Sequence, residues 1–313
     1  MNTKQGGTLS PWLAALCLWA GCTDEPASPT APASPGDSLR VIPAGSKPSG
    51  PSGQKPQMVD MDIDELRLIL VRPGSPAREA GFQPGDRILA GDGKDLASEE
   101  ALEAALAKTD KGKKIFFEVR RGKQVLTLPL STSRPGWQIL TGDLFKGFLL
   151  SRAQKKPEIH KPMPGEKAPR IELPGYQREQ VIVDPASGKA CALLFWGTFL
   201  EPSYAHLQAF RKACESAGER IDCTSIDTME LFTAVQKTEP YARELDRVHA
   251  EIWSGPIGID LFMASERMYG VQKLPTLVLL GKDGTVVERF DGPLAKPDEQ
   301  IPAAFDKLTS AGR

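Results

Sequence analysis

The chain has 313 residues, of which 40% are hydrophobic and 25% are charged. This length predicts about two folded domains, and the composition can supply each of them with an apolar core. Lysine and arginine number 39 against 40 acidic residues, which gives a formal net charge of -1. Such a balance provides no basic surface for nucleic acid and no polybasic face for a membrane, so we expect neither partner on electrostatic grounds.

Residues 1–22 differ from the rest and are typical of an export signal. Lys4 precedes the apolar run PWLAALCLWA, which fits a signal-peptide core and is too short to cross a bilayer as a helix. The run ends in LWAGC, which resembles the lipobox of bacterial lipoproteins, except that Trp19 stands where leucine is usual. The resemblance implies acylation at Cys22. The alternative is an ordinary cleaved signal with an incidental cysteine.

Residues 23–57 predict a disordered tether. They contain eight prolines and almost no large apolar side chains, so they cannot bury enough surface to offset the entropy lost on ordering. A spacer of this kind suits a domain that is tied to a membrane through a lipid at Cys22. A merely tolerated low-complexity insert is the alternative.

Folded structure is expected from Met58, and the first domain is predicted to end at Ser133. The apolar run LRLILV predicts a strand at 66–71, and GSPAREAGFQPGD predicts a short helix and a turn. Ser98 is expected to cap a helix that runs to Lys108, and two strands joined by a tight turn follow. The string GSPA-x-x-AG-x-x-x-GD-x-I resembles a bacterial PDZ domain, a small β-sandwich or barrel with two helices, of the kind attached to envelope proteases.

PDZ domains bind an extended peptide as an added strand and hold its terminal carboxylate with a glycine-containing loop. Carried onto this chain, the resemblance implies a binding edge at 66–71 beside the predicted helix. The loop before that edge, VDMDIDEL, has four acids and no glycine, which disfavours capture of a carboxylate. Internal-strand binding and docking onto the second domain remain as alternatives. The predicted peptide-binding residues of this domain are Leu66, Leu68, Leu70, Leu102 and Leu106.

Residues 134–160 are predicted to form a connector. Their apolar side chains indicate that the segment packs partly on one neighbouring domain, but the sequence does not decide which one. A second pattern, at 161–311, alternates strands and helices and ends with a hairpin and a helix, which predicts an α/β sandwich.

The second domain carries three motifs in order: G-x-x-AP-x-x-x-LP, GK-x-x-x-LLFW-x-T-x-x-x-P and YGV-x-x-LPT. Together they resemble the thioredoxin fold of TlpA/ResA-type periplasmic redoxins over residues 163–292. The resemblance implies an active site beside Trp196 and a cis peptide bond before Pro275. It also places Leu200 and Ser203 at the two positions where these redoxins have cysteine.

Dithiol chemistry at this position is excluded by the two substitutions. Thiol–disulfide exchange needs a thiolate at a helix start and a second thiol that resolves the mixed disulfide, and neither leucine nor serine supplies one. Cys191, Cys214 and Cys223 most simply predict small core residues, while a structural disulfide between Cys214 and Cys223 and a displaced redox pair are the alternatives.

The other polar residues give no stronger candidate. Ser203 is expected to be a helix N-cap, and His206 is expected to face solvent rather than to act as a base. His160 and His249 are isolated, and no spacing in the sequence predicts a metal site or a cofactor.

Two function classes therefore remain. The first is a lipid-anchored protein of the bacterial envelope, facing the periplasm, that binds envelope proteins or peptides in the groove beside Trp196, Leu274 and Pro275 without reacting with them. The second is an envelope thiol oxidoreductase that uses the displaced cysteines. The residues favour the first class, because the scaffold around the missing cysteines is retained.

Overall fold

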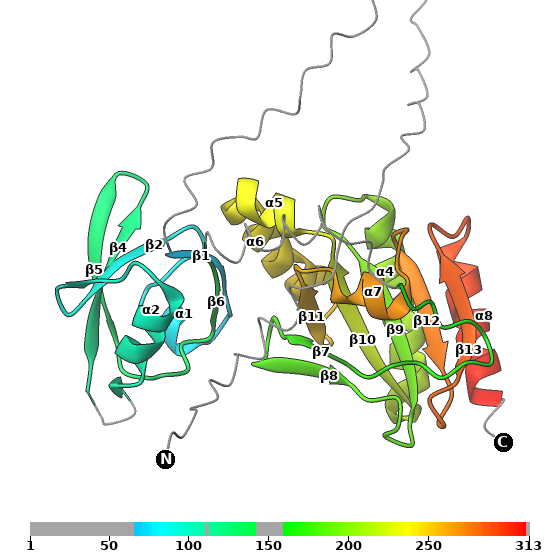
Figure 1. Ribbon diagram of the computed structural model, residues 1–313. Helices are drawn as coiled ribbons and strands as arrows, with labels where there is room; N and C mark the ends of the chain where they lie inside the picture. Colours follow the sequence, from blue (N-terminus) through cyan, green and yellow to red (C-terminus); the bar gives the residue numbers. More distant parts are fainter. Residues whose placement is uncertain (1–65, 110–112, 142–158, 311–313) are drawn as a thin grey trace, which may run out of the picture.

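The computed structural model describes residues 66–109, 113–141 and 159–310, which form two folded units (Figure 1). The first unit is built on a six-stranded sheet, and the second on a five-stranded sheet with helices packed against it. The predicted export signal and tether lie outside the described residues, as does connector segment 142–158.

The first unit is a small antiparallel β structure. Its sheet order is β5-β4-β2-β1-β6, and β3 pairs with β2. Ser98 accepts a hydrogen bond from the amide of Ala101 at 3.2 Å, which confirms the predicted helix cap. The elements are β1 (Leu66–Val71), α1 (Pro76–Glu79), β2 (Arg87–Gly91), β3 (Lys94–Asp95), α2 (Glu99–Leu106), β4 (Ile115–Arg121), β5 (Gln124–Leu130) and β6 (Trp137–Leu140).

A buried ion pair stabilises the turn before β2. Asp86 is completely buried, and its two carboxylate oxygens accept hydrogen bonds from Nε and Nη2 of Arg121, each at 2.7 Å. The Gln83 amide donates to the same carboxylate, and Arg121 Nη2 also donates to the Gly81 carbonyl. Both oxygens of this buried carboxylate therefore accept hydrogen bonds, as a buried charge requires.

Strand β1 is an interior strand, so the prediction that 66–71 forms a free edge is wrong. It pairs with β2 on one side and with β6 on the other. The outer strand, β6, comes from the segment that was predicted to be a connector. The aromatic ring of Trp137 packs 5.0 Å from that of Phe82, and this contact ties the new strand to the core of the first unit.

The second unit has the strand order β11-β10-β9-β12-β13, with a separate two-stranded sheet, β7-β8. Its elements are β7 (Ile171–Pro174), β8 (Gln180–Val183), β9 (Ala190–Trp196), α4 (Pro202–Ala217), η3 (Gly218–Arg220), β10 (Ile221–Thr228), α5 (Leu231–Gln236), α6 (Thr238–Arg247), η4 (Val248–Ile252), β11 (Ile257–Asp260), α7 (Ala264–Tyr269), β12 (Thr276–Leu280), β13 (Val286–Asp291) and α8 (Pro297–Ser310).

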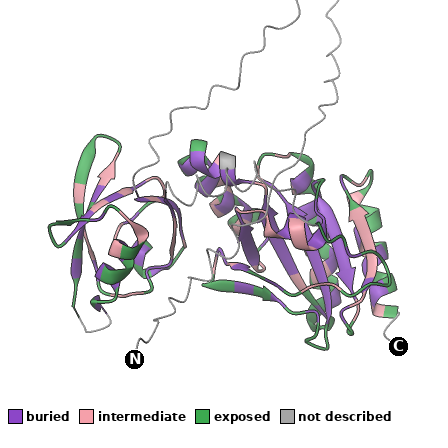
Figure 2. Ribbon diagram, viewed as in Figure 1, coloured by how far each residue is buried: buried purple, intermediate pink, exposed green. Residues whose placement is uncertain are grey.

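The central strand β9 is buried along its whole length (Figure 2). It runs parallel to β10 and antiparallel to β12. Alternate residues enter two different apolar clusters: Leu194 packs with side chains of α4 and α8, and Leu193 packs with those of β7 and α7. This two-sided burial was predicted from the continuous apolar run, and it is typical of a sheet covered on both faces.

The two units touch along α6. Ile69 of β1 and Leu140 of β6 belong to the same buried cluster as Leu245, and β1 lies against α6 (Figure 1). Arg78 Nη2 lies 3.5 Å from Asp246 Oδ2 across this contact. A cavity of about 310 Å³ opens beside the ion pair, between the loop after α1 and α6.

Candidate functional site

The first candidate site lies between the end of β9 and the start of α4, beside the cis peptide bond. We call it the cis-proline site (residues 196–203 and 274–276). Trp196 is fully buried at the end of β9, and Leu200 is partly exposed just before the helix. Glu201 is the N-cap residue, so the prediction that Ser203 caps the helix is wrong. Ser203 is fully buried in the first turn, and its Oγ accepts a hydrogen bond from the Gly197 amide at 3.4 Å.

His206 is buried, with only 3% of its surface exposed, so the expectation of a solvent-facing histidine is wrong. Its Nδ1 lies 2.8 Å from the Pro202 carbonyl, and its Nε2 accepts a hydrogen bond from the Leu294 amide at 2.8 Å. Burial lowers the pKa of His206 and keeps the ring neutral. Because both ring nitrogens are occupied by backbone groups, His206 does not activate the Ser203 hydroxyl.

The peptide bond between Leu274 and Pro275 is cis, as the resemblance implied. Thr276, the next residue, is paired with Phe195 in the β9–β12 ladder, so the cis bond lies beside the end of β9. A Cβ atom on Gly197 would lie 2.7 Å from the Phe199 ring and 3.3 Å from Leu274 Cδ1. The missing side chain therefore lets these two apolar residues come together.

Phe199 presents the exposed apolar surface of this site. About half of it (49%) is exposed, whereas Leu274 is only 7% exposed. Of the two residues, Phe199 therefore offers more contact area to a partner, although the sequence analysis selected only Leu274.

Two buried acids lie beneath the site, and neither was predicted from the sequence. Asp227 is directly opposite Trp196 in the β9–β10 ladder, and Glu230 follows the end of β10. One Glu230 oxygen accepts hydrogen bonds from the amide and hydroxyl of Thr198, which fixes the loop before α4. Their position at the carboxyl end of the predicted strand RIDCTSID was the available signal.

Burial raises the pKa of both acids. For Asp227 the charge of Glu230 adds to the effect of burial, while a hydrogen bond from Tyr241 at 2.6 Å opposes it. For Glu230 burial likewise outweighs its hydrogen bonds. One oxygen of each carboxyl and the indole nitrogen of Trp196 are buried without a hydrogen-bond partner among the described residues.

The cysteines lie away from this site. Cys214 and Cys223 form a disulfide with their Cα atoms 6.2 Å apart, so their prediction as simple core residues is replaced by the structural disulfide that was its alternative. Cys191 is free and buried on the other face of the sheet, among the β7 and α7 contacts. Burial raises the pKa of its thiol to about 11, which leaves it protonated and weakly reactive at neutral pH.

The second candidate site is the outer edge of β6, together with the loop before it. The Pro135 carbonyl accepts from the Ala77 amide, and the Gly136 carbonyl accepts from the Arg72 amide. In a trans peptide plane the N–H points opposite to the C=O. The amides of Gly136 and Trp137 therefore point away from α1 and β1, and two successive amides arranged in this way favour an anion.

Arg72 adds a positive charge to this loop. Gly136 has a φ of +78°, and a Cβ atom there would lie 2.5 Å from Ser75 Cβ and 3.0 Å from Arg72 Nη2, so the glycine suits both the left-handed turn and the close approach of Ser75, with the guanidinium beside it. Arg134, also in the loop, lies 3.8 Å from the Glu179 carboxylate of the second unit. Pro135-Gly136 before a short alternating run was the signal for this edge, but it was assigned to the connector.

The predicted peptide-binding leucines of the first unit do not line this edge. Leu66, Leu68, Leu102 and Leu106 are buried in the core of the first unit, and Leu70 is buried in the cluster that reaches the second unit. Their apolar alternation reports the core rather than a ligand contact.

Membrane-spanning helices and metal-binding clusters are both absent from the described residues. None of the helices in the described ranges is long and apolar enough to cross a membrane. Within residues 66–109, 113–141 and 159–310, no group of three or more histidine, cysteine, aspartate or glutamate side chains is placed to hold a metal ion.

Comparison with known proteins separates the two units. A model of the PDZ domain family matches residues 53–132. A candidate zinc metalloprotease of Neisseria meningitidis, NMA0084, is 46% identical over 57 residues, which are 18% of this chain and 13% of that protein.

The remaining similarities concern the thioredoxin-like half. The thiol-disulfide oxidoreductase ResA of Bacillus anthracis is 26% identical over 168 residues, which are 53% of this chain and 86% of that protein. The crystal structure of StoA from Bacillus subtilis aligns with a TM-score of 0.36 at 19% identity, covering 45% of this chain and 98% of that chain. The chain thus joins a PDZ domain to a thioredoxin-like domain homologous to the ResA-type thiol-disulfide oxidoreductases.

Proposed function

We propose that this protein is a binding protein of the bacterial envelope that holds extended chains without exchanging thiols with them. One observation carries the proposal: the cis-proline site keeps the buried Trp196 and the cis bond before Pro275, while Leu200 and Ser203 supply no nucleophile. A chain bound there gains backbone pairing and contact with Phe199, and neither interaction needs sulfur.

The proposal includes a second binding position on the PDZ domain, at the outer edge of β6. The outward amides of Gly136 and Trp137 suit a terminal carboxylate, and the guanidinium of Arg72 adds a charge of the correct sign. The acidic loop that argued against such capture precedes β1, whereas this loop precedes β6. Capture of a chain end is therefore favoured more strongly than the sequence alone suggested.

Envelope location and lipid anchoring belong to the same proposal. Cys22 lies outside the described residues, so its acylation is supported by the lipobox-like LWAGC and the tether that follows it. The Cys214–Cys223 disulfide adds independent support, because such bonds persist in an oxidising compartment and are rare in the cytosol.

The binding role is tested with reduced, carboxymethylated α-lactalbumin, an unfolded chain without free thiols, by fluorescence anisotropy. We expect Phe199→Asp to weaken binding about ten-fold or more, because it removes an exposed apolar contact and adds a charge. Phe116→Asp is the matched control, since Phe116 is also half exposed (50%) but lies on β4. Equal binding by wild type and Phe199→Asp would contradict the proposal.

The PDZ edge is tested with a labelled decapeptide of alternating serine and valine, as the free acid and as the C-terminal amide. We expect the wild type to prefer the free acid, and Arg72→Met to remove that preference. Glu179→Gln should tighten the free acid a few-fold, because the Glu179 carboxylate next to Arg134 repels the incoming one. A wild type that binds acid and amide equally would exclude carboxylate capture.

Catalysis by the displaced cysteines is the second candidate, and the Cys214–Cys223 disulfide and the homology to ResA favour it. This hypothesis predicts that the wild type reduces insulin with turnover. The double variant Cys214→Ala, Cys223→Ala would then be inactive. The binding proposal predicts no turnover from the wild type.

A further inference from the structure

The segment that joins the two domains ends as a strap, residues 159–168, that lies along the thioredoxin-like domain. The His160 amide donates to the Arg267 carbonyl at 2.8 Å, near the end of α7. The Ala168 amide donates to the Gly284 carbonyl at 2.9 Å, in the turn between β12 and β13. The strap is therefore fixed to this domain through its backbone at two separate places.

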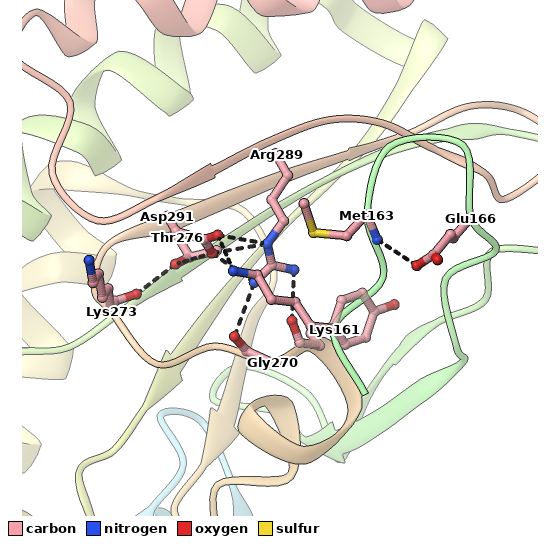
Figure 3. Close-up of polar contacts among 9 residues, drawn as sticks. Lys161, Met163, Glu166, Gly270, Lys273, Thr276, Arg289 and Asp291 are labelled. Atoms are coloured by element: carbon pink, nitrogen blue, oxygen red, sulfur yellow. Dashed lines mark hydrogen bonds and ion pairs between the residues drawn. The ribbon is translucent and has the colours of Figure 1, made fainter. Parts of the chain in front are cut away.

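Between these two points, Lys161 contacts the loop that carries the cis bond (Figure 3). Its Nζ lies 2.9 Å from Asp291 Oδ2. Gly270, at the end of α7, has a φ of +59°, and a Cβ atom there would lie 2.5 Å from Lys161 Cβ. Glycine at 270 thus permits both the left-handed turn and the close approach of the strap.

Asp291 also forms an ion pair with a buried arginine, Arg289. Only 2% of the Arg289 side chain is exposed, and its Nη2 lies 2.7 Å from Asp291 Oδ1. The same guanidinium donates to the Tyr269 carbonyl at 2.7 Å and to the Gly270 carbonyl at 3.2 Å. One buried, charge-assisted cluster therefore fixes the start of the loop that leads to the cis bond.

The far end of this loop is tied to the same residue through the sheet. Thr276 is paired with Asp291 in the β12–β13 ladder. Its hydroxyl donates to the Lys273 carbonyl at 2.6 Å, inside the loop, and lies 3.5 Å from Asp291 Oδ1. Pro275 immediately precedes Thr276, so the cluster holds the loop on both sides of the cis bond (Figure 3).

Asp291 is well suited to this role because it stays ionised. Burial opposes ionisation, but the hydrogen bonds from Arg289 and Lys161 outweigh it and leave the pKa of Asp291 below its ordinary value. Lys161 is the outermost member, with 43% of its side chain exposed. It is also the only member that belongs to the strap.

We propose that Lys161 is a positioning residue for the cis-proline site: through Asp291, Arg289 and Gly270 it sets the position of the Leu274–Thr276 segment. The inference rests on the proposed function, since it concerns the edge at which an extended chain would pair. Lys161 touches no ligand itself. It links the segment that joins the two domains to the position of the Leu274–Thr276 segment.

The test uses the full chain with Lys161→Met, which keeps the length of the side chain and removes its charge. We expect the affinity for carboxymethylated α-lactalbumin to fall about two- to five-fold, the range that an exposed ion pair supports. Amide hydrogen exchange of residues 269–276 should speed up by a similar factor, while exchange in α8 stays unchanged. Lys161→Arg should restore both measurements.

Lys167→Met is the matched control. Lys167 is also on the strap and forms an exposed ion pair, with Asp283 at 2.8 Å, but at the β12–β13 turn away from the cis bond. We expect no change in binding and none in exchange of 269–276. The inference is overturned if Lys161→Met exchanges like the wild type, or if Lys167→Met has the same effect. If even the wild type does not bind the probe, the proposed function fails while the exchange measurement still decides the role of Lys161.

Discussion

The two ends of helix α4 differ in their cysteine content: the start has none, and Cys214 lies near the end. At its start, Leu200 and Ser203 carry no thiol, although the resemblance to the redoxins places these two residues at cysteine positions. Near its end, Cys214 is joined to Cys223 of β10. Ser203 and Cys214 are eleven residues apart, which is about 16 Å along a helix axis.

The position of a cysteine on a helix decides what it can do. At the N-terminus, free amides and the helix dipole stabilise a thiolate, which makes the sulfur a nucleophile. Near the C-terminus the dipole has the opposite sign and disfavours the thiolate. The Cys214–Cys223 bond is therefore suited to linking a helix to its neighbouring strand, whereas Leu200 and Ser203 at the start of the helix carry no thiol.

The largest expected effect comes from restoring the missing pair. Leu200→Cys with Ser203→Cys, in a background with Cys214→Ala and Cys223→Ala, should create insulin-reducing activity at least ten-fold above the uncatalysed rate. The measurement is the turbidity of reduced insulin in the presence of dithiothreitol.

The single variant Leu200→Cys is the control for this gain. Without a resolving thiol it should form mixed disulfides and show no turnover. A folded double variant that forms the new disulfide but does not reduce insulin would show that the start of α4 has lost more than its cysteines.

Removing the Cys214–Cys223 disulfide, near the other end of α4, should lower the stability of the protein without changing its affinity for an unfolded chain. Cys214→Ala with Cys223→Ala frees a loop with a sequence separation of 9, and chain entropy assigns to that loop a loss of about 2.5 kcal/mol in the free energy of unfolding. Urea denaturation measures this loss, and the affinity for carboxymethylated α-lactalbumin should stay the same.

Dithiothreitol supplies the control for this second comparison. It should destabilise the wild type by a similar amount and leave the double alanine variant unchanged. Loss of binding in that variant would mean that the two ends of α4 are coupled.

Sequence alone predicted those features that depend on local pattern. The two-sided burial of β9 follows from one contiguous apolar run. The cis bond before Pro275 was implied by the resemblance that short motifs carry. The burial of His206 does not, because it depends on an amide 88 residues further along the chain. The pattern around His206 is that of an ordinary helix surface.

The outer strand of the first unit was misassigned for the same physical reason. A run such as 66–71 predicts a strand, but its neighbours are chosen by contacts between distant segments. Strand β6 pairs with β1, and the Trp137 ring packs on Phe82, far from it in the sequence. Only four residues of β6 carry the alternating signal, which is too little to separate it from a connector.

The smallest expected effect concerns Asp227, the buried acid opposite Trp196 in the β9–β10 ladder. Asp227 is fully buried, and burial together with the Glu230 charge raises its pKa. The native state therefore retains a proton that the unfolded chain releases near pH 4. The contribution of this group to stability is complete below that pH and is lost as the pH rises toward the folded-state pKa.

Asp227→Asn removes this pH-dependent loss of stability, because an amide does not ionise in this range. The amide oxygen of asparagine can still accept the hydrogen bond from the Tyr241 hydroxyl. We expect the free energy of unfolding of the variant, relative to wild type, to increase between pH 5 and pH 8, with a slope of at most about 1.4 kcal/mol per pH unit. Asp283→Asn is the control of opposite sign: hydrogen bonds from Lys167 and Thr285 lower the pKa of Asp283, so its contribution is lost only as the pH falls below the ordinary carboxyl range. A pH profile of Asp227→Asn parallel to that of the wild type would mean that Asp227 is ionised in the native state. The start of α4 would then lie over a buried charge, and a thiol restored at position 203 would be harder to ionise.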